Sequence, residues 1–204
     1  MIAVVTGGSG GLGRAVCEEL SRRGYEVRSW SRTDGVDATR EAAVRAAAAE
    51  LEDWRVLVNN AAVLLPKAVV ETSIEDWEAT LAAGLTAAFL CSREAFRLMR
   101  PGGAIVNVGS LSGVRDTEKF PGMAAYVAAK SGLAGRTEAL AVEGRRLGIR
   151  VNAVSPGSID TPMLALSGAP REPALVPAEV ARMIGWLAAP ESAPLTGANL
   201  RIDP

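Results

Sequence analysis

The sequence predicts an α/β fold in which helices cover both faces of one doubly wound, parallel sheet. Two observations support this prediction. Short apolar segments that barely alternate in polarity take turns along the chain with longer segments whose apolar residues recur every three or four positions. A glycine-rich stretch, TGGSGGLG at residues 6–13, joins the first apolar segment to the first helical one. With 204 residues and no internal repeat, the chain is expected to form a single domain over residues 1–204.

Each expected element follows from its local pattern. The strands are short apolar runs, at residues 2–5, 26–31, 36–38, 55–59, 104–108, 150–154 and 199–202. The helices show a period near 3.6, at residues 11–23, 39–51, 73–99, 124–146 and 177–188. Thr39 and Ser73 are expected N-caps, and Pro177 opens the last helix. Residues 158–176 show no clear element, and because they follow a strand they could lie over a ligand site at the carboxyl ends of the strands.

The composition excludes several classes of function. A net charge of -1 and a pI near 5.7 give no reason to expect nucleic acid or an anionic membrane as a partner. Because the chain has no histidine, catalysis by Ser-His-Asp or Cys-His groups is excluded, as is any His-ligated metal. Cys17 and Cys91 are too few and too distant for a disulfide framework or a zinc site, so no metal is expected. Without a signal-peptide pattern or a long apolar run, we expect a cytoplasmic protein.

The glycine-rich stretch fits two different patterns. Gly8, Gly10 and Gly13 fit G-x-G-x-x-G, whereas Gly7, Gly11 and Gly13 after Thr6 fit T-G-x-x-x-G-x-G. Either set, placed between a strand and a helix, would bring backbone N–H groups and the positive end of a helix to one point. This arrangement binds phosphate. The stretch by itself does not choose between the two sets.

Three polar residues further along the chain are candidates for proton transfer. Tyr126 and Lys130 stand four positions apart in an expected helix and therefore share a face. An ammonium group there favours the phenolate and lowers the tyrosine pKa, which suits a general acid or base. Ser110 follows the strand at residues 104–108, where its hydroxyl can hydrogen-bond a substrate carbonyl. Each of these features by itself also fits a merely structural role, as a surface pair or a turn serine.

Taken together, these segments resemble the short-chain dehydrogenase/reductase family, almost from end to end. The matching pieces stand in family order: Thr6 to Gly13, Asn59-Asn60-Ala61-Ala62, Ser110, Tyr126 with Lys130, and Pro156-Gly157 followed by Ile159 and Thr161. The resemblance implies a Rossmann-like fold with three catalytic residues. Tyr126 would exchange a proton with the substrate oxygen, and Ser110 would position the carbonyl. Lys130 would hold the nicotinamide ribose and depress the Tyr126 pKa.

The resemblance also implies where a nicotinamide cofactor binds. The pyrophosphate and adenosine ribose would be surrounded by Gly7, Ser9, Gly11, Leu12 and Gly13, which makes Gly8 and Gly10 spacers. Asp37 and Ala38 would flank the adenine. The cofactor ribose would be lined by Asn60, Ala61 and Ala62, and the carboxamide would meet Ile159 and Thr161 beyond Pro156 and Gly157.

Two departures from the family pattern affect the prediction. Gly84 stands where the family usually carries a catalytic asparagine, seven positions after Trp77. Our hypothesis is that water takes the place of that side chain and that activity survives at an equal or reduced level. The helix that the family usually has between its second and third strands is expected to be absent, because only residues 33–35 separate those strands here.

The residues after the second strand favour NADP(H) over NAD(H). Ser31 stands where an acidic residue would bind the 2′-hydroxyl of NAD, and Arg32 follows it. A hydroxyl and a guanidinium suit a 2′-phosphate instead. Gly10 stands where some NADP-preferring relatives carry a basic residue, so Arg32 would bear that contact alone.

The sequence thus predicts an NAD(P)-dependent oxidoreductase acting on a small carbonyl or secondary alcohol. A low-turnover cofactor-binding sensor or structural protein, and an epimerase or dehydratase on the same scaffold, stay open as alternatives. Apolar residues on several faces of the two long helices predict a homo-oligomer, a tetramer or dimer as in the family. The substrate pocket is expected from residues 111–122 and 158–176.

Overall fold

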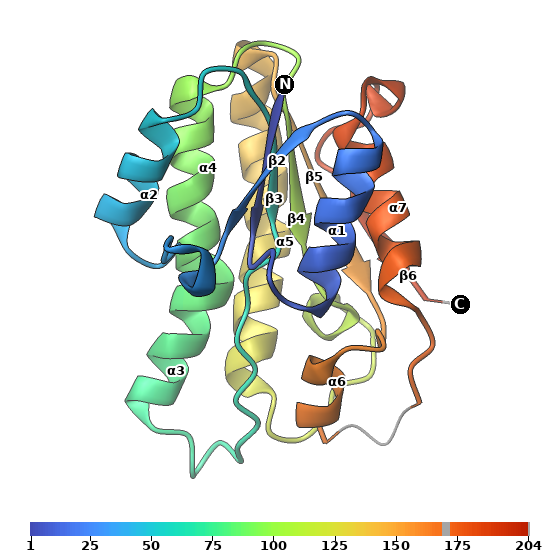
Figure 1. The fold of residues 1–204 in the computed structure, drawn as a ribbon. Coiled ribbons are helices and arrows are strands. Elements are labelled where there is room, and N and C mark those ends of the chain that lie inside the picture. The colour runs from blue at the N-terminus through green and yellow to red at the C-terminus, as the bar shows by residue number, and fades with distance from the viewer. Residues whose placement is uncertain (169–171, 204) are drawn as a thin grey trace.

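The chain folds around one parallel sheet, with strands in the order β2-β1-β3-β4-β5-β6 (Figure 1). The structure is a computed structural model that describes residues 1–168 and 172–203. Within them the strands are β1 (Ile2–Thr6), β2 (Glu26–Trp30), β3 (Trp54–Asn59), β4 (Ala104–Val108), β5 (Arg150–Pro156) and β6 (Asn199–Ile202). Every neighbouring pair is parallel, which confirms the predicted doubly wound sheet.

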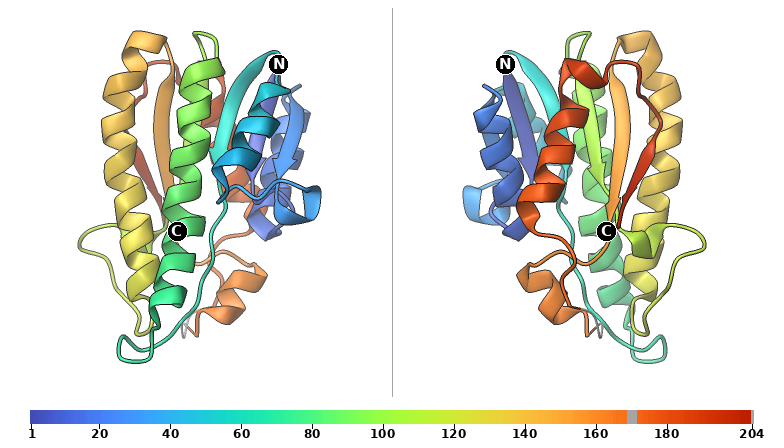
Figure 2. Two further views of the ribbon diagram at one scale, coloured as in Figure 1. Left: turned by 90° about the vertical axis from the view of Figure 1, so that its left-hand side faces the viewer. Right: turned by 90° about the vertical axis from the view of Figure 1, so that its right-hand side faces the viewer.

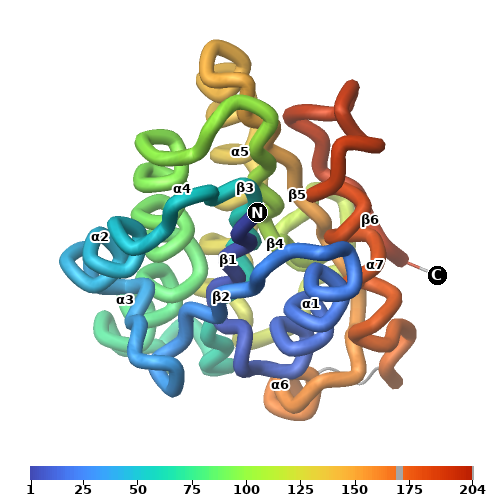
Figure 3. Tube along the Cα trace, turned by 45° about the horizontal axis from the view of Figure 1, so that its top comes forward, coloured from blue at the N-terminus to red at the C-terminus, as the bar shows by residue number. Residues whose placement is uncertain are grey.

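Helices cover both faces of this sheet, as Figures 2 and 3 show. One face carries α1 (Gly11–Arg22) and α7 (Pro177–Ala188), and the other carries α2 (Glu41–Ala49), α4 (Ala87–Leu98) and α5 (Ala124–Gly144). Two further helices, α3 (Ile74–Leu81) and α6 (Pro162–Leu166), extend beyond the carboxyl edge of the sheet. That edge is therefore walled by helices and loops.

The inner strands β1 and β4 are buried at every position because they pack against two hydrophobic cores. Val4 and Ile105 belong to the core under α2 and α4, together with Cys91, whereas Val5 and Val106 belong to the core under α1 and α7. Successive residues of a strand point to opposite faces, so a sheet covered on both faces needs apolar side chains at every position. This double burial explains why the strands show little alternation in the sequence.

The expected strand at residues 36–38 is wrong. After β2 the chain makes a 3-10 turn at Arg32–Asp34, closed by Gly35 at φ +85°. The carboxylate of Asp37 then accepts hydrogen bonds from the backbone N–H and the hydroxyl of Thr39. These local bonds turn the chain toward α2 instead of extending it along the edge strand β2. Because this strand does not form, the next strand after β2 is β3, and α2 lies between the two.

Of the two expected N-caps, Ser73 is confirmed and Thr39 is wrong. Ser73 begins α3 with a capping box, in which its hydroxyl accepts from the Asp76 N–H and the Asp76 carboxylate accepts from the Ser73 N–H. Thr39 is not a cap, because α2 begins at Glu41 and the Thr39 hydroxyl is bonded to Asp37. The expected helix at residues 73–99 is α3 and α4 joined by a π-helical segment, Ala82–Thr86, centred on Gly84.

Candidate active site

A large cavity opens at the carboxyl ends of the strands, between the glycine-rich turn and the amino-terminal end of α5. Its volume is about 1080 Å³, at the upper end of the range for small-molecule sites. Every residue that the sequence predicts for the site lines it: Gly7, Ser9, Gly11, Leu12, Gly13, Ser31, Arg32, Asp37, Ala38, Asn60, Ala61, Ala62, Ser110, Tyr126, Lys130, Pro156, Gly157, Ile159 and Thr161. The fold therefore gathers residues from six separate segments of the chain.

The close packing of the glycine-rich turn distinguishes between its two glycine patterns. Gly7 has φ +65°, a conformation that favours glycine. A Cβ on Gly13 would overlap the Gly7 carbonyl oxygen and lie 2.8 Å from Asn60 Nδ2. A Cβ on Gly11 would lie 3.0 Å from the Thr161 methyl group. Gly7 and Gly13 therefore occupy positions that require glycine, whereas at Gly11 the Thr161 side chain would have to shift to admit a Cβ.

One of the two predicted spacers is not a spacer. A Cβ on Gly10 would meet only the Gly7 carbonyl oxygen, at an ordinary 3.4 Å, so that prediction agrees with the structure. A Cβ on Gly8, however, would overlap the Ser29 hydroxyl and lie 3.0 Å from Cys17 Sγ. Gly8 is thus needed where the turn crosses between β2 and α1, a contact between distant segments that local sequence does not reveal.

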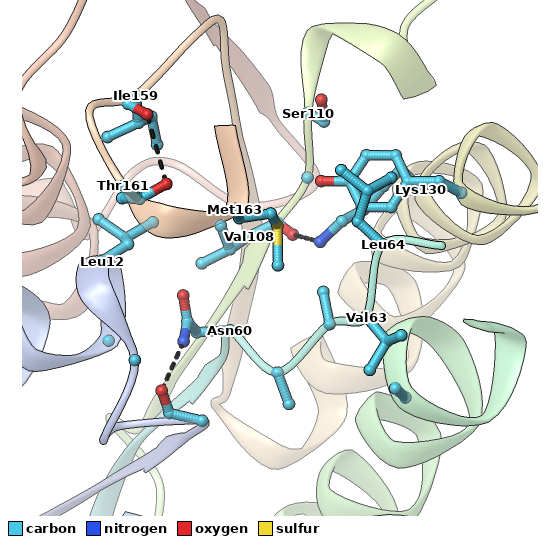
Figure 4. A pocket seen from close by; sticks show the side chains of 18 of the residues that line it. Leu12, Asn60, Val63, Leu64, Val108, Ser110, Lys130, Ile159, Thr161 and Met163 are labelled. Carbon is cyan, nitrogen blue, oxygen red and sulfur yellow. Dashed lines mark hydrogen bonds between the residues drawn. The ribbon is translucent and has the colours of Figure 1, made fainter. Parts of the chain in front are cut away.

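Hydrogen bonds between the ends of β1 and β3 hold the turn in place. The Thr6 hydroxyl accepts from the backbone N–H groups of Asn60 and Ala61, at 3.0 Å each. The Asn60 side chain donates back to the carbonyl oxygens of Thr6 and Gly7, at 3.0 and 3.1 Å (Figure 4). The Asn60 amide nitrogen is therefore committed to the protein backbone, and the residue shapes the floor of the cavity.

A buried polar network, which the sequence analysis did not predict, supports the same edge of the sheet. Asn59 and Asn107 are neighbours in the β3–β4 register, and Asn59 Nδ2 donates to Asn107 Oδ1 at 2.8 Å. Asn59 also donates to Ser92 on α4, and Asn107 donates to Thr137 on α5, at 3.1 and 2.9 Å. Because buried amides are costly when unpaired, this network ties α4 and α5 to the strand ends.

The three predicted catalytic side chains meet at one end of the cavity. Tyr126 and Lys130 lie on one face of α5, with Lys130 Nζ 5.6 Å from the centroid of the Tyr126 ring. Lys130 Nζ donates to the Val108 carbonyl oxygen at 2.6 Å, at the end of β4 (Figure 4). Ser110 follows the same strand and lines the same end of the cavity. A phenol, an alcohol and an ammonium group thus face a common space.

The predicted effect of Lys130 on the tyrosine pKa is wrong in this structure. Burial raises the pKa of Tyr126 to about 12, and only the hydrogen bond from Ser110 opposes that rise. Burial lowers the pKa of Lys130 to about 8. The ammonium group lies over the ring and bonds to a backbone carbonyl, so it does little for the phenolate oxygen. Tyr126 is therefore neutral near pH 7 and is a proton donor in that state.

The residues after β2 form the other end of the cavity. The Ser31 hydroxyl bonds to Thr33 Oγ1 and Asp34 Oδ2, at 2.7 and 2.5 Å, so it is held within its own turn. Hydrogen bonds from the Ser29 and Ser31 hydroxyls lower the pKa of Asp34. No ion pair or side-chain hydrogen bond joins Arg32 to the described residues. Its guanidinium group is the cation available to an anionic ligand here.

Several lining residues were not predicted. The segments at residues 111–122 and 158–176 contribute as expected, through Leu111, Phe120 and Met163 among others, although residues 169–171 of the second lie outside the described residues. The segments after β3 and β6 contribute as well, through Leu64 and Asp203. The rule that ligands bind at the carboxyl ends of parallel strands could have indicated both.

Gly84 does not line the cavity. It is buried in the π-helical segment, and a Cβ there would lie 3.2 Å from the Cβ of Ala129, the neighbour of Lys130 in α5. Helix α5 therefore approaches closely where an asparagine side chain would otherwise point. The hypothesis that water replaces that side chain stays a prediction.

The described residues contain neither a helix that could span a membrane nor a cluster of metal-binding side chains. None of their helices is long and apolar enough to cross a membrane. No group of three or more acidic or cysteine side chains is close enough together there to hold a metal ion.

The chain is similar to known oxidoreductases over most of its length. The family model described as enoyl-(acyl carrier protein) reductase matches residues 35–204. The cis-4-hydroxycyclohexanecarboxylate dehydrogenase of Sinomonas cyclohexanicum is 35% identical over 99% of this chain and 94% of its own length. An uncharacterized short-chain type dehydrogenase/reductase of Sinorhizobium fredii is 35% identical over 99% of this chain, which spans only 43% of that relative.

A solved structure extends the likeness to three dimensions. The crystal structure of a short-chain dehydrogenase from Burkholderia cenocepacia in complex with NADP has a TM-score of 0.89 and 29% identity. The match covers 98% of this chain and 95% of that one. Sequence and fold agree over nearly the whole length, and the chain belongs to the short-chain dehydrogenase/reductase family of oxidoreductases.

Proposed function

We propose that this protein is an NADP(H)-dependent reductase or dehydrogenase that interconverts a carbonyl compound and a secondary alcohol, with Tyr126 as the general acid or base. One observation carries the proposal: a single cavity has Ser110, Tyr126 and Lys130 at one end and a side-chain-free glycine turn with an unpaired Arg32 at the other. A nicotinamide dinucleotide has its phosphates and its reactive ring at different ends, so it needs a phosphate-binding turn and a proton donor in the same cavity.

The residues present fit a nicotinamide dinucleotide. The turn requires glycine at Gly7 and Gly13, so backbone N–H groups and the amino-terminal end of α1 are open to a pyrophosphate. Arg32 is available to a 2′-phosphate. The cofactor, when bound, supplies or accepts the hydride. The protein supplies position and the proton.

The proton is handled by Tyr126. In the reductive direction, its hydroxyl gives a proton to the substrate oxygen as the carbonyl becomes an alcohol. Ser110 donates a hydrogen bond to the same oxygen and so stabilises the charge that develops there. Lys130, held by the Val108 carbonyl oxygen, would contact the nicotinamide ribose of the bound cofactor.

The experiment is to follow NADPH absorbance against a panel of ketones. We expect turnover by the wild type and a loss of about 100- to 10,000-fold in kcat for Tyr126→Phe, the usual contribution of a general acid. NADPH binding by Tyr126→Phe should stay close to that of the wild type, as NADPH fluorescence would show. Full activity in this variant would remove Tyr126 from its role.

One observation favours a second function, a low-turnover cofactor-binding protein that acts as a sensor or structural partner. Gly84 replaces the asparagine that the resemblance places in the catalytic group, and α5 fills the space beside it. Tight binding of NADPH, without oxidation of NADPH in the presence of any ketone of the panel, would support this alternative.

We also propose a homo-oligomer formed through α4 and α5. Phe89 is 47% exposed and Val142 is 64% exposed, although both stand on long apolar helices. The guanidinium nitrogens of Arg136 on α5 are buried without a hydrogen-bond partner among the described residues, an arrangement that is costly in a lone subunit. Sedimentation that gave only monomers would refute this.

A cytoplasmic location is supported by the unpaired Cys17 and Cys91.

A further inference from the structure

A lysine side chain closes the loop that follows β4, at residues 111–119. Lys119 Nζ donates to the Val114 carbonyl oxygen at 2.5 Å and to Thr117 Oγ1 at 2.7 Å. A longer bond of 3.5 Å reaches the Leu111 carbonyl oxygen. The Thr117 hydroxyl contacts the same two carbonyl oxygens, at 3.0 Å for Val114 and 2.5 Å for Leu111. One ammonium group and one hydroxyl thus connect four positions of the loop, an arrangement that we call the Lys119 clasp.

We propose that the Lys119 clasp is a positioning device for catalysis, which holds this loop as a fixed wall at the reacting end of the cavity and fixes the orientation of the Ser110 hydroxyl. The inference rests on the proposed function, because its effect on turnover requires a substrate carbonyl at Tyr126. Lys119 itself does not line the cavity, so it acts through the residues that it holds.

The loop is coupled to Ser110 through its first residues. Ser110 Oγ accepts a hydrogen bond from the Ser112 N–H at 3.2 Å, and the Ser110 carbonyl oxygen accepts one from the Gly113 N–H at 2.9 Å. The Val114 N–H closes the next bond, to the Leu111 carbonyl oxygen, at 2.9 Å. The two carbonyl groups bound by the clasp therefore belong to the turn that orients the Ser110 hydroxyl. A change in the clasp moves that hydroxyl.

The same turn packs directly on α5 beside Lys130. A Cβ on Gly113 would lie 2.6 Å from the Lys130 carbonyl carbon and 2.9 Å from the Ser131 backbone nitrogen, so a side chain there would force the turn away from the helix. Ser131 Oγ donates to the Gly113 carbonyl oxygen at 3.0 Å. The loop is thus seated on α5 at one side and closed by the clasp at the other, which fixes its position relative to Tyr126.

The far side of the loop carries backbone strain that the clasp opposes. Asp116 has φ +59°, and among the described residues it is the one non-glycine residue with positive φ. This left-handed conformation is unfavourable for a residue with a side chain, so it persists where surrounding contacts enforce it. The bonds from Lys119 to Val114 and Thr117 flank Asp116 on both sides. Without them we expect Asp116 to relax and the segment to leave the cavity wall, to which Asp116 and Thr117 both belong.

Cleavage by an arginine-specific protease after Arg115 measures whether the clasp holds the loop in solution. Arg115 is exposed within the loop, and such a protease does not cut at residue 119 in any variant. Lys119→Met removes the ammonium group and keeps an apolar side chain, and we expect its cleavage after Arg115 to be about 10-fold faster or more, because cleavage follows local opening. Equal rates for Lys119→Met and the wild type would overturn the inference.

Lys67→Met is the matched control for this measurement. The Lys67 ammonium group is paired with Asp76 at 2.6 Å, outside the loop, and it does not line the cavity. The variant therefore loses the same charge without touching the clasp. We expect its cleavage after Arg115 and its kcat to equal those of the wild type. A response equal to that of Lys119→Met would show a general effect of charge and overturn the inference.

Turnover measures whether the clasp positions the catalytic groups. With the best ketone of the panel, Lys119→Met should lose about 10- to 100-fold in kcat, since a misplacement of about 1 Å at a reacting centre costs up to about 100-fold. Its Kd for NADPH should equal that of the wild type, because the glycine-rich turn and Arg32 are separate from this loop. Faster cleavage with an unchanged kcat would show a clasp without a positioning role and overturn the inference.

A second variant tests whether the two polar groups act as one unit. Thr117→Val removes the hydroxyl and keeps Lys119, so it supplies the same two measurements if Lys119→Met does not fold. The double variant Lys119→Met/Thr117→Val should lose no more kcat than Lys119→Met, because groups in one hydrogen-bonded network are not additive. Losses that multiply in the double variant would contradict the clasp.

The outcomes separate this inference from the proposed function. If the wild type oxidises no NADPH with any ketone, the proposed function fails, and the cleavage rates still decide whether Lys119 holds the loop. If the wild type turns over and Lys119→Met matches it in kcat, the inference fails and the reductase stands.

Discussion

Substitution of Gly13 by alanine is the sharpest test of how the glycine-rich turn works. The added Cβ would overlap the Gly7 carbonyl oxygen, so the turn must shift. It would also lie 2.8 Å from Asn60 Nδ2, whereas nonbonded carbons prefer neighbours at about 3.5 Å or more, so the amide must withdraw by about 0.7 Å. Its bonds to the Thr6 and Gly7 carbonyl oxygens, at 3.0 and 3.1 Å, would then exceed the usual hydrogen-bond limit of about 3.5 Å.

The expected loss of stability follows from these two effects. Two buried hydrogen bonds contribute about 1 kcal/mol each, and overpacking costs about 1–3 kcal/mol, so Gly13→Ala should lower the free energy of unfolding by about 3–5 kcal/mol. Displacement of the turn should also remove a charge-assisted hydrogen bond to the pyrophosphate, worth about 1.5–3 kcal/mol, which weakens NADPH binding about 10- to 150-fold.

Gly10→Ala is the matched control in the same turn. Its Cβ would meet only the Gly7 carbonyl oxygen, at 3.4 Å, and Gly10 is the N-cap of α1 in an extended conformation that alanine also adopts. We expect a loss within about 1 kcal/mol, the usual cost of alanine at an N-cap. Urea unfolding followed by tryptophan fluorescence measures the stabilities, and NADPH fluorescence measures the affinities. Equal losses in the two variants would refute the packing argument.

Three further predictions concern the two ends of the cavity and its flank. Arg32→Ala should raise KM for NADPH about 10-fold or more and leave KM for NADH nearly unchanged, since a charge-assisted bond to phosphate contributes about 1.5–3 kcal/mol; steady-state kinetics with both cofactors decides this, and a lower wild-type KM for NADH would contradict it. Because burial lowers the pKa of Lys130 to about 8, the unfolded chain binds more protons than the folded one above that pH, so Lys130 makes the wild type gain stability between about pH 8 and 10. Urea unfolding across that range should show the gain as a difference from Lys130→Met, and parallel profiles would exclude it. Gly84→Asn should lower the free energy of unfolding by about 1–3 kcal/mol by overpacking against Ala129, and the added variant Ala129→Gly should recover part of that loss; a stabilised single variant would show that α5 yields at this point.

The sequence predicted the order of strands and helices well because the two kinds of burial leave different patterns. Double-sided burial makes β1 and β4 apolar at all but one position each, and the apolar residues of a helix buried on one side recur every three or four positions. The prediction of a strand at residues 36–38 was wrong because this segment leaves no clear burial pattern. It is too short for a periodic pattern, and the hydrogen bonds from Thr39 to Asp37 direct the chain elsewhere.

The residues of the site could be predicted because they belong to motifs that stand at strand ends. A motif at the end of a strand is carried to the common edge by the topology, whatever its separation along the chain. Gly8 could not be understood in this way. Its role depends on Ser29 and Cys17, which approach it only when β2 and α1 pack together.

The sequence by itself determined the parallel α/β fold, the glycine-rich turn between the first strand and the first helix, and the chemistry available without histidine. These depend on residue type and on spacing within single segments. The tertiary structure decided which glycines must lack a side chain, that burial rather than Lys130 governs the Tyr126 pKa, and which charged residues line the cavity. Each of these depends on distances between segments far apart in the chain, and such distances exist only once the sheet has formed.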